Sequence, residues 1–263
     1  MYQNLVFHVE DHIATIAIDR PEVMNALDSD TFISLTQAFQ DCSSDPEIRA
    51  VVLTGQGRAF CAGGDMVGFQ KNLSAPFDRE HTYQRVLRAN ACAVSIRRCW
   101  KPVIAMVNGP CIGAGLSLAL ACDFRIISHK TKMRASFINV GLTGDTGIGF
   151  FLTEHVGLAK ATEIMMLGDP ILPEEAARLG LANQLVEDDA LQETAYGLAK
   201  RLAKGPTAAY RGQKMMLWEA SSTLFAAYQD AEAAHMTDSL GSEDFREAVT
   251  AFLGKRKPSF TGQ

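Results

Sequence analysis

The sequence lacks the cysteine pairs, the long apolar runs and the excess of basic residues that characterise several large classes of protein. Its six cysteines form no C-x-x-C pair and no H-E-x-x-H pattern occurs, so we expect no metal site. The longest apolar stretch, residues 111–122, has about half of the roughly 20 residues that a membrane span needs, and we interpret it as a buried helix. Lys plus Arg number 25 against 30 Asp plus Glu, and this balance argues against a nucleic-acid partner.

The composition is that of a folded protein with reduced thiols. Over 263 residues, 47% are hydrophobic and 21% are charged, which is close to the average for globular domains. Several cysteines lie inside apolar runs, where a free thiol behaves as a small hydrophobic group. The first residues do not place a basic segment before an apolar one, so we expect no secretory signal and a cytoplasmic location.

The first half of the chain alternates short apolar strands with helices. Residues 5–9 and 13–18 predict a hairpin, because apolar residues alternate there with small or polar ones. Further strands are predicted at 50–54, 103–107 and 123–128, and helices from Asp28 or Ser29 to Cys42 and at 81–99 and 113–122. This alternation favours an α/β fold with a mostly parallel sheet.

The second half predicts helices almost exclusively. They are expected at 159–167, 173–179, 191–204, 207–240 and 243–253. We therefore predict a core domain over residues 1–200 and a C-terminal helical region over 201–263, which would serve oligomerisation.

Two glycine-containing turns each follow a predicted strand. They are Ala62-Gly63-Gly64-Asp65-Met66 and Gly113-Ala114-Gly115. Such turns leave backbone N–H groups free at the start of a helix. Two N–H groups that converge from separate strands would form an oxyanion hole, whereas the alternative is a pair of ordinary tight turns.

Asp145 is the only acidic residue in a segment with four glycines, Gly141-Leu142-Thr143-Gly144-Asp145-Thr146-Gly147-Ile148-Gly149. One interpretation is a cap for the following helix, which would favour the charged carboxylate. The other is a carboxyl group in an apolar cavity, with a raised pKa suited to proton transfer.

Taken together, these features resemble the crotonase, or enoyl-CoA hydratase/isomerase, superfamily. The resemblance covers nearly the whole chain, with its segments in the expected order. Its segments are Arg20-Pro21, Asn25-Ala26-Leu27, GRAFCAGGD at 57–65, KPVIAMVNG at 101–109, Gly113-Ala114-Gly115, Ala121-Cys122-Asp123, EEAARLGLA at 174–182 and AFLGKRKP at 251–258.

The resemblance implies a spiral of ββα units followed by C-terminal helices, and an assembly of three or six copies. It also implies an acyl-CoA thioester substrate, as in fatty-acid or aromatic-acid degradation, with coenzyme A as part of that substrate and no tightly bound cofactor. The thioester oxygen would be bound by the N–H groups of Gly64 and Ala114. Coenzyme A contacts would map to Ala26, Ala62, Asp65 and Met66, and to Phe252 and Lys255 from a neighbouring subunit.

Departures from the family pattern indicate the reaction. Hydratases of this family carry two glutamates, and their positions hold Ser117 and either Val140 or Gly141 here. Asp145 matches instead the acid of the family's isomerases, such as the ring-epoxide phenylacetyl-CoA isomerase type, whose loop also has the form G-L-x-x-D-x-G. We therefore predict an enoyl-CoA isomerase with Asp145 as its acid/base.

Other activities stay open at this point. A hydratase would require Asp145 to act alone on water, and a lyase that forms or opens a ring is compatible with an aspartate here. Nucleophilic dehalogenation is disfavoured, because Asn90 stands where such enzymes have a histidine and His81 lies more than two turns earlier. A non-catalytic acyl-CoA-binding protein is the alternative outside enzymes.

Overall fold

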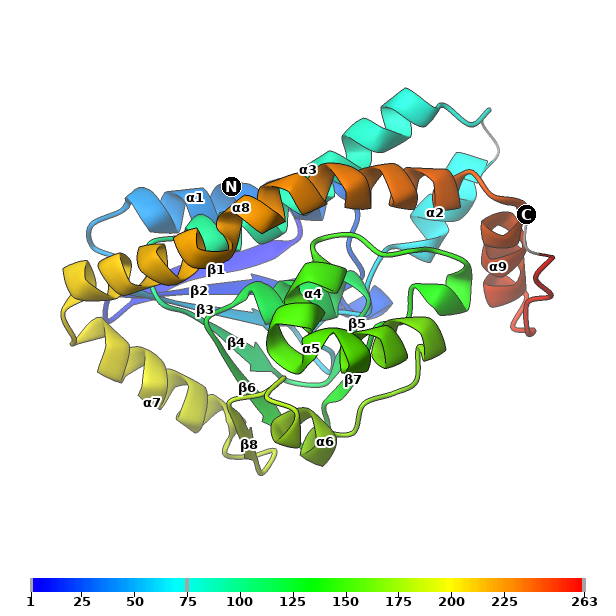
Figure 1. Ribbon diagram of the computed structural model, residues 1–263. Coiled ribbons are helices and arrows are strands. Elements are labelled where there is room, and N and C mark those ends of the chain that lie inside the picture. Colours follow the sequence, from blue (N-terminus) through cyan, green and yellow to red (C-terminus); the bar gives the residue numbers. More distant parts are fainter. Residues whose placement is uncertain (1, 74–75, 262–263) are drawn as a thin grey trace.

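The computed structural model describes residues 2–73 and 76–261, without the side chains of 72–73 and 221–227 (Figure 1). At its centre is a six-stranded sheet in which only the first pair is antiparallel, and this pair is the predicted hairpin. In spatial order the strands are β1 (Leu5–Glu10), β2 (Ile13–Ile18), β3 (Ala50–Gly55), β4 (Val103–Val107), β6 (Phe124–Ser128) and β8 (Gln184–Val186).

The central strands are apolar throughout because helices cover both faces of the sheet. Along β3, Val51 and Leu53 belong to the larger hydrophobic core, whereas Ala50 and Val52 belong to the second core on the opposite face. Helices α1 (Ser29–Ser44) and α3 (Arg79–Arg98) contribute to the larger core, and α7 (Leu191–Ala203) packs on the opposite face. The two-residue period of the strands thus places successive side chains in different cores.

The chain winds as a spiral. After each of the strands β2, β3, β4 and β6 of the central sheet comes a second short extended segment, and this segment pairs with the corresponding segment of the next turn of the spiral. Strands β5 (Pro110–Ile112) and β7 (Lys132–Arg134) form a small parallel sheet. Isolated bridges extend this ladder on both sides of it: Leu27 to Gly64, Cys61 to Cys111, and Met133 to Ile171. This arrangement confirms the predicted α/β spiral.

Several short elements differ from the prediction. Helix α2 (Met66–Leu73) and the three-residue strands β5, β7 and β8 were not predicted. Helix α5 (Ile148–Leu167) starts 11 residues earlier than predicted and is kinked at Gly157, whose φ is 76°. The remaining short elements are η1 (Pro21–Val23), η2 (Ile138–Val140) and α6 (Pro173–Arg178).

The C-terminal helices pack back over the core. Helix α8 (Thr207–Leu240) runs along α3, and α9 (Glu243–Leu253) packs beside α2 and η2 (Figure 1). Helix α4 (Ala114–Ala121), which precedes them in the chain, is buried beneath α3 and α5. The predicted boundary between residues 200 and 201 falls inside α7, three residues before that helix ends.

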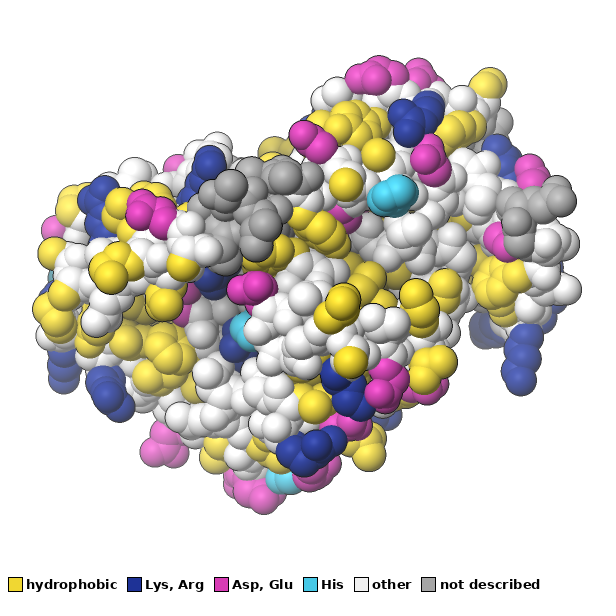
Figure 2. Space-filling model, in the orientation of Figure 1, with side chains coloured by type: hydrophobic (Ala, Val, Ile, Leu, Met, Phe, Trp, Pro, Cys, Tyr) yellow, Lys and Arg dark blue, Asp and Glu magenta, His cyan; other side chains and the backbone are white. Residues whose placement is uncertain are grey.

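All six cysteines are free and buried. Within the described ranges, no helix is both long and apolar enough to cross a membrane. On the face shown in Figure 2, acidic and basic side chains are interspersed.

Candidate active site

Gly64 lies in a loop and Ala114 begins α4, and hydrogen bonds join the backbone segments that precede these two residues. Cys61 N–H donates to the Pro110 carbonyl at 3.0 Å, and Ile112 N–H donates to the Cys61 carbonyl at 2.9 Å. A Cβ atom added at Gly63 would lie 3.1 Å from the Ile112 carbonyl oxygen and 3.8 Å from the Gly113 Cα, so the two backbones are in van der Waals contact. Gly63 and Gly113 have φ values of 92° and 55°, which favour glycine.

The two amides at these positions are left without an acceptor. The residues on either side of Gly64 both pair with Leu27. Leu27 N–H donates to the Gly63 carbonyl, and Asp65 N–H donates to the Leu27 carbonyl. Ala114 is the first residue of α4, where an N–H group has no partner within the helix. In the described part of the chain, neither the Gly64 N–H nor the Ala114 N–H donates a hydrogen bond.

Asp145 does not cap the following helix. The N-cap position of α5 is Gly147, which has φ 81° and no side-chain cap, so the capping interpretation is wrong. Asp145 is partly buried, and its Oδ1 accepts a hydrogen bond from the Thr146 hydroxyl at 3.2 Å. Burial raises the pKa of Asp145 to about 6, although this hydrogen bond acts in the opposite direction.

Side chains from three helices bind the backbone that directly follows the Asp145 side chain. Asn90 Oδ1 on α3 accepts from Thr146 N–H at 2.7 Å, and the Ser117 hydroxyl on α4 donates to the Asp145 carbonyl at 3.3 Å. Glu232 on α8 accepts from Gly147 N–H at 2.8 Å through Oε2. Gly144 and Thr146 have φ values of 120° and 54°, so these bonds stabilise a conformation that most residues disfavour.

The ring of Phe137 connects the loop at residues 141–147, which carries Asp145 and is called the acid loop below, to the turn at Gly113. Its Cζ atom lies 3.8 Å from a Cβ added at Gly113, and its Cδ2 atom lies 3.6 Å from a Cβ added at Gly144. Ser117 makes a second link, because it belongs to the helix that begins at Ala114 and contacts the Asp145 backbone. The structure therefore brings Gly64, Ala114 and Asp145 into one region.

The residues predicted to contact coenzyme A divide into two groups. Ala62, Asp65 and Met66 neighbour Gly64 in sequence, and Ala26 precedes Leu27, which bridges to Gly64. Asp65 Oδ2 accepts from Arg20 at 2.9 Å. Burial would raise the pKa of Asp65, but hydrogen bonds from Arg20, Gly68 and Val67 outweigh burial and lower it. Asp65 Oδ1 also accepts the N–H groups of Val67 and Gly68 at the start of α2. Phe252 and Lys255 form the second group, exposed at the C-terminal end of α9.

Glu232 is the residue that the sequence analysis missed. Its side chain is 6% exposed, and its Oε1 accepts from the Tyr228 hydroxyl at 2.9 Å. Burial and the nearby Asp145 charge raise the pKa of Glu232 to about 7, while hydrogen bonds from Gly147 and Tyr228 act to lower it. The spacing of Tyr228 and Glu232 places them on one face of a helix, together with the buried Ala233, Met236 and Thr237. In the sequence, the only signal that could have identified Glu232 is a glutamate on the buried face of a helix.

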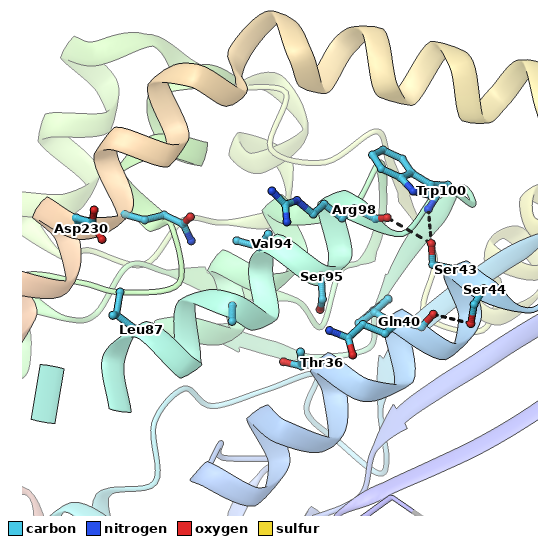
Figure 3. A pocket seen from close by; sticks show the side chains of 13 residues that line it. Thr36, Gln40, Ser43, Ser44, Leu87, Val94, Ser95, Arg98, Trp100 and Asp230 are labelled. Carbon is cyan, nitrogen blue, oxygen red and sulfur yellow. Dashed lines mark hydrogen bonds between the residues drawn. The ribbon is translucent and has the colours of Figure 1, made fainter. Parts of the chain in front are cut away.

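The described structure contains a groove that lies away from Asp145 and a smaller pocket near the Gly64 turn. A groove of about 670 Å³ runs between α1, α3 and α8 (Figure 3). At one end of it, the Ser43 hydroxyl donates to the Arg98 carbonyl and accepts from Trp100 N–H.

A smaller pocket of about 190 Å³ is lined by Phe69, Phe77, Thr82, Arg85 and Phe245, among others. Phe69 also covers Gly64, because a Cβ there would lie 2.8 Å from its ring, so the smaller pocket adjoins the Gly64 turn.

The donor set does not favour a metal. Among the described residues, no group of three or more His, Cys, Asp or Glu side chains could hold an ion. The polar groups around Asp145 are instead backbone N–H donors and two carboxyl groups with raised pKa values.

Comparisons with known proteins agree with this geometry. The family model described as enoyl-CoA hydratase/isomerase matches residues 8–263. A probable enoyl-CoA hydratase of Rhodobacter capsulatus is 38% identical, with 100% of this chain and 99% of the relative covered. The 1,2-epoxyphenylacetyl-CoA isomerase of Escherichia coli is 33% identical, with 100% of both chains covered.

A solved structure supports the same conclusion. The crystal structure of an enoyl-CoA hydratase from Mycobacterium avium subsp. paratuberculosis superimposes with a TM-score of 0.90 at 27% identity, covering 99% of this chain and 100% of the other. The spiral fold, the two open amides beside a carboxyl group and the match over nearly the whole sequence agree: the chain belongs to the enoyl-CoA hydratase/isomerase family.

Proposed function

We propose that this protein is an enoyl-CoA isomerase that shifts a carbon–carbon double bond along the acyl chain, with Asp145 as the acid/base. The observation that carries the proposal is one partly buried carboxyl group near two unoccupied N–H donors. The hydratase positions support it too, because Ser117 is occupied with backbone carbonyls and Val140 and Gly141 carry no acid.

The reaction needs only one group that accepts a proton and returns it. The Asp145 carboxylate removes a proton from the carbon next to the thioester carbonyl, and the electron pair of that C–H bond forms an enolate. The N–H groups of Gly64 and Ala114 stabilise the negative oxygen of the enolate. Asp145 then returns the proton two carbons further along the chain, and the double bond moves into conjugation with the thioester. A pKa of about 6 leaves the group mostly ionised at pH 7, and it is a stronger base than an exposed aspartate.

The substrate is proposed to be an acyl-CoA thioester, with no other cofactor. Ala26, Ala62, Asp65 and Met66 form the rim of the Gly64 turn, where the coenzyme A part would lie. The smaller pocket beside Gly64 contains three phenylalanine rings against which the acyl group would pack, and its lining also includes the charged Arg85 and Arg246.

Hydration is the second candidate, because Glu232 supplies a further carboxyl group near Asp145. Both oxygens of Glu232 already accept hydrogen bonds, from Gly147 and Tyr228, and the side chain is 6% exposed. A carboxyl group held in this way is poorly placed to activate a water molecule, so isomerisation remains the stronger proposal.

The test compares two substrates in parallel. The purified protein receives a 3-enoyl-CoA, and separately a 2-enoyl-CoA in water, and both conjugated-thioester absorbance and product mass are followed. We expect absorbance to rise with the 3-enoyl substrate at constant mass, and kcat/KM to rise with pH through about 6. Asp145→Asn should lower kcat at least about a hundredfold.

The exposed Asp189 provides the matched control, and Asp189→Asn should leave the rate unchanged. A mass gain of one water from the 2-enoyl substrate would instead establish a hydratase. Binding of both thioesters without any turnover would contradict the isomerase and favour a non-catalytic acyl-CoA-binding protein.

A further inference from the structure

Glu232 connects the C-terminal helix α8 to the loop that carries Asp145. Its Oε2 accepts the Gly147 N–H at 2.8 Å, two residues after Asp145, and its Oε1 accepts the Tyr228 hydroxyl at 2.9 Å. A buried carboxyl group is costly unless it is hydrogen-bonded, and here both oxygens have a partner. The contact therefore fixes the position of Gly147, and with it the acid loop.

The charges around Glu232 do not neutralise it. The charge of Asp145 acts on Glu232 from the loop, Tyr228 hydrogen-bonds to it from its own helix, and neither group is a cation. From α3, Asn90 is neutral, Tyr83 reaches Asp230 at 3.5 Å and Arg79 pairs with Asp238. Helix α5 contributes backbone groups of Gly149 and Phe150 near Tyr228. In the part of the chain that the structure describes, no Lys or Arg forms an ion pair with Glu232.

We propose that Glu232 is a positioning residue for Asp145: it fixes the acid loop through Gly147, and its negative charge makes the Asp145 carboxylate a stronger base. This proposal rests on the proposed acid/base function of Asp145. Two like charges in a low-dielectric site repel each other, and a proton taken up by either group relieves that repulsion. Removal of a proton from the substrate by Asp145 is then more favourable when Glu232 is ionised.

The order of ionisation follows from the two pKa values. The pKa of Asp145 is about 6, and that of Glu232 is about 7 because burial, and after it the charge of Asp145, raise it. The pair therefore titrates in two steps. We expect the rate of isomerisation to rise with pH through the first step and to rise again through the second.

Glu232→Gln separates the charge of Glu232 from its hydrogen bonds. The amide oxygen can still accept from Gly147 N–H, and the amide nitrogen can donate to the Tyr228 oxygen, so the loop is retained. We expect kcat above pH 8 to fall about three- to tenfold with KM little changed, and the upper step of the pH profile to disappear. Glu219→Gln makes the same chemical change at an exposed site of α8 and should have no effect.

Glu232→Ala removes both the charge and the hydrogen bonds to the loop. We expect kcat to fall about 10- to 100-fold at every pH, because Asp145 is then less precisely placed. Below pH 6, Glu232→Gln should keep most of the kcat that Glu232→Ala loses. Equal rates for the alanine and glutamine variants at low pH would overturn the positioning role.

A titration that needs no turnover separates this proposal from the proposed function. Infrared difference spectra follow the protonated carboxyl groups of the wild type, Glu232→Gln and Asp145→Asn against pH. We expect wild-type steps near pH 6 and pH 7, loss of the upper step in Glu232→Gln, and a shift of the Glu232 step to lower pH in Asp145→Asn. A Glu232 step that does not move in Asp145→Asn would refute the electrostatic coupling, whether or not the protein isomerises enoyl-CoA.

Discussion

At the scale of the residue, the site depends on groups whose local environment changes their chemistry. Asp145 has an ordinary side chain, but burial raises its pKa to about 6, and Glu232 reaches about 7 for the same reason and because Asp145 is close. The sequence predicted the first of these acids, since Asp145 stands alone among glycines in a recognisable loop. It could not predict the second, because the contact between Glu232 and Gly147 joins residues 85 positions apart.

These raised pKa values predict how stability varies with pH. Unfolding exposes Asp145 and Glu232, whose pKa values then return to about 4. The stability that their protonated forms contribute is complete below about pH 4 and is lost as pH rises through about 6 and 7. We therefore expect the Tm of Glu232→Gln, relative to the wild type, to increase between pH 5 and pH 8.

Thermal denaturation of both proteins across that range measures this difference. Glu219→Gln, measured in parallel, should keep a constant Tm difference from the wild type. A Glu232→Gln difference that is constant as well would show that the buried Glu232 titrates normally.

At the scale of the element, the sequence predicted the long pieces and missed the short ones. Strands of five or six residues show clear apolar runs, as in β3 and β4, whereas β5, β7 and β8 have three residues each and show no period. Helix α2 was missed because its start depends on Asp65 accepting two N–H groups, in a segment whose glycines indicate a loop. The close approach of the turns at Gly64 and Gly113 depends on pairing between Cys61 and Cys111, which no local pattern encodes.

The packing of α4 against Cys61 predicts the effect of a single methyl group. A Cβ at Gly115 would lie 2.7 Å from both the Cβ and the carbonyl oxygen of Cys61, which is too close. Gly115→Ala should therefore move α4 away from the Gly64 turn and separate the two open amides. We expect kcat/KM to fall about a hundredfold and the free energy of unfolding to decrease by about 1–3 kcal/mol.

Gly197→Ala is the control for this substitution. Gly197 is exposed within helix α7, and nothing lies within 4 Å of an added Cβ. We expect this variant to keep full activity and to gain about 0.5–1 kcal/mol of stability. If Gly115→Ala retained wild-type kinetics, the two turns would not act together.

At the scale of the whole molecule, we propose an assembly of three or six copies in which α9 faces a neighbour. Phe252 is 59% exposed at the end of α9, and Lys255 follows it in an exposed position. The family resemblance assigns both to the coenzyme A site of an adjacent subunit. The C-terminal helices, with Glu232 on α8, would then serve both the site of their own chain and that of the next.

A comparison of two lysines tests this assembly. Lys255→Ala should raise KM for an enoyl-CoA about two- to fivefold and leave kcat unchanged, because an exposed cation contributes modestly to anion binding. Lys257→Ala removes the same charge two residues later and should change neither constant. Light scattering gives the number of copies, and a monomer with full activity would contradict the proposed role of Lys255.

The burial of the six thiols has a consequence for an enzyme that handles thioesters. A thiolate attacks a thioester and transfers the acyl group to itself, so a reactive cysteine near the substrate would capture the acyl chain. Cys61 lies beside the Gly63 N–H in the oxyanion turn, yet burial raises its pKa to about 12 and keeps it in the thiol form. A thioester bound at the proposed oxyanion hole would therefore not acylate Cys61, and thiol-alkylating reagents should leave the folded protein active.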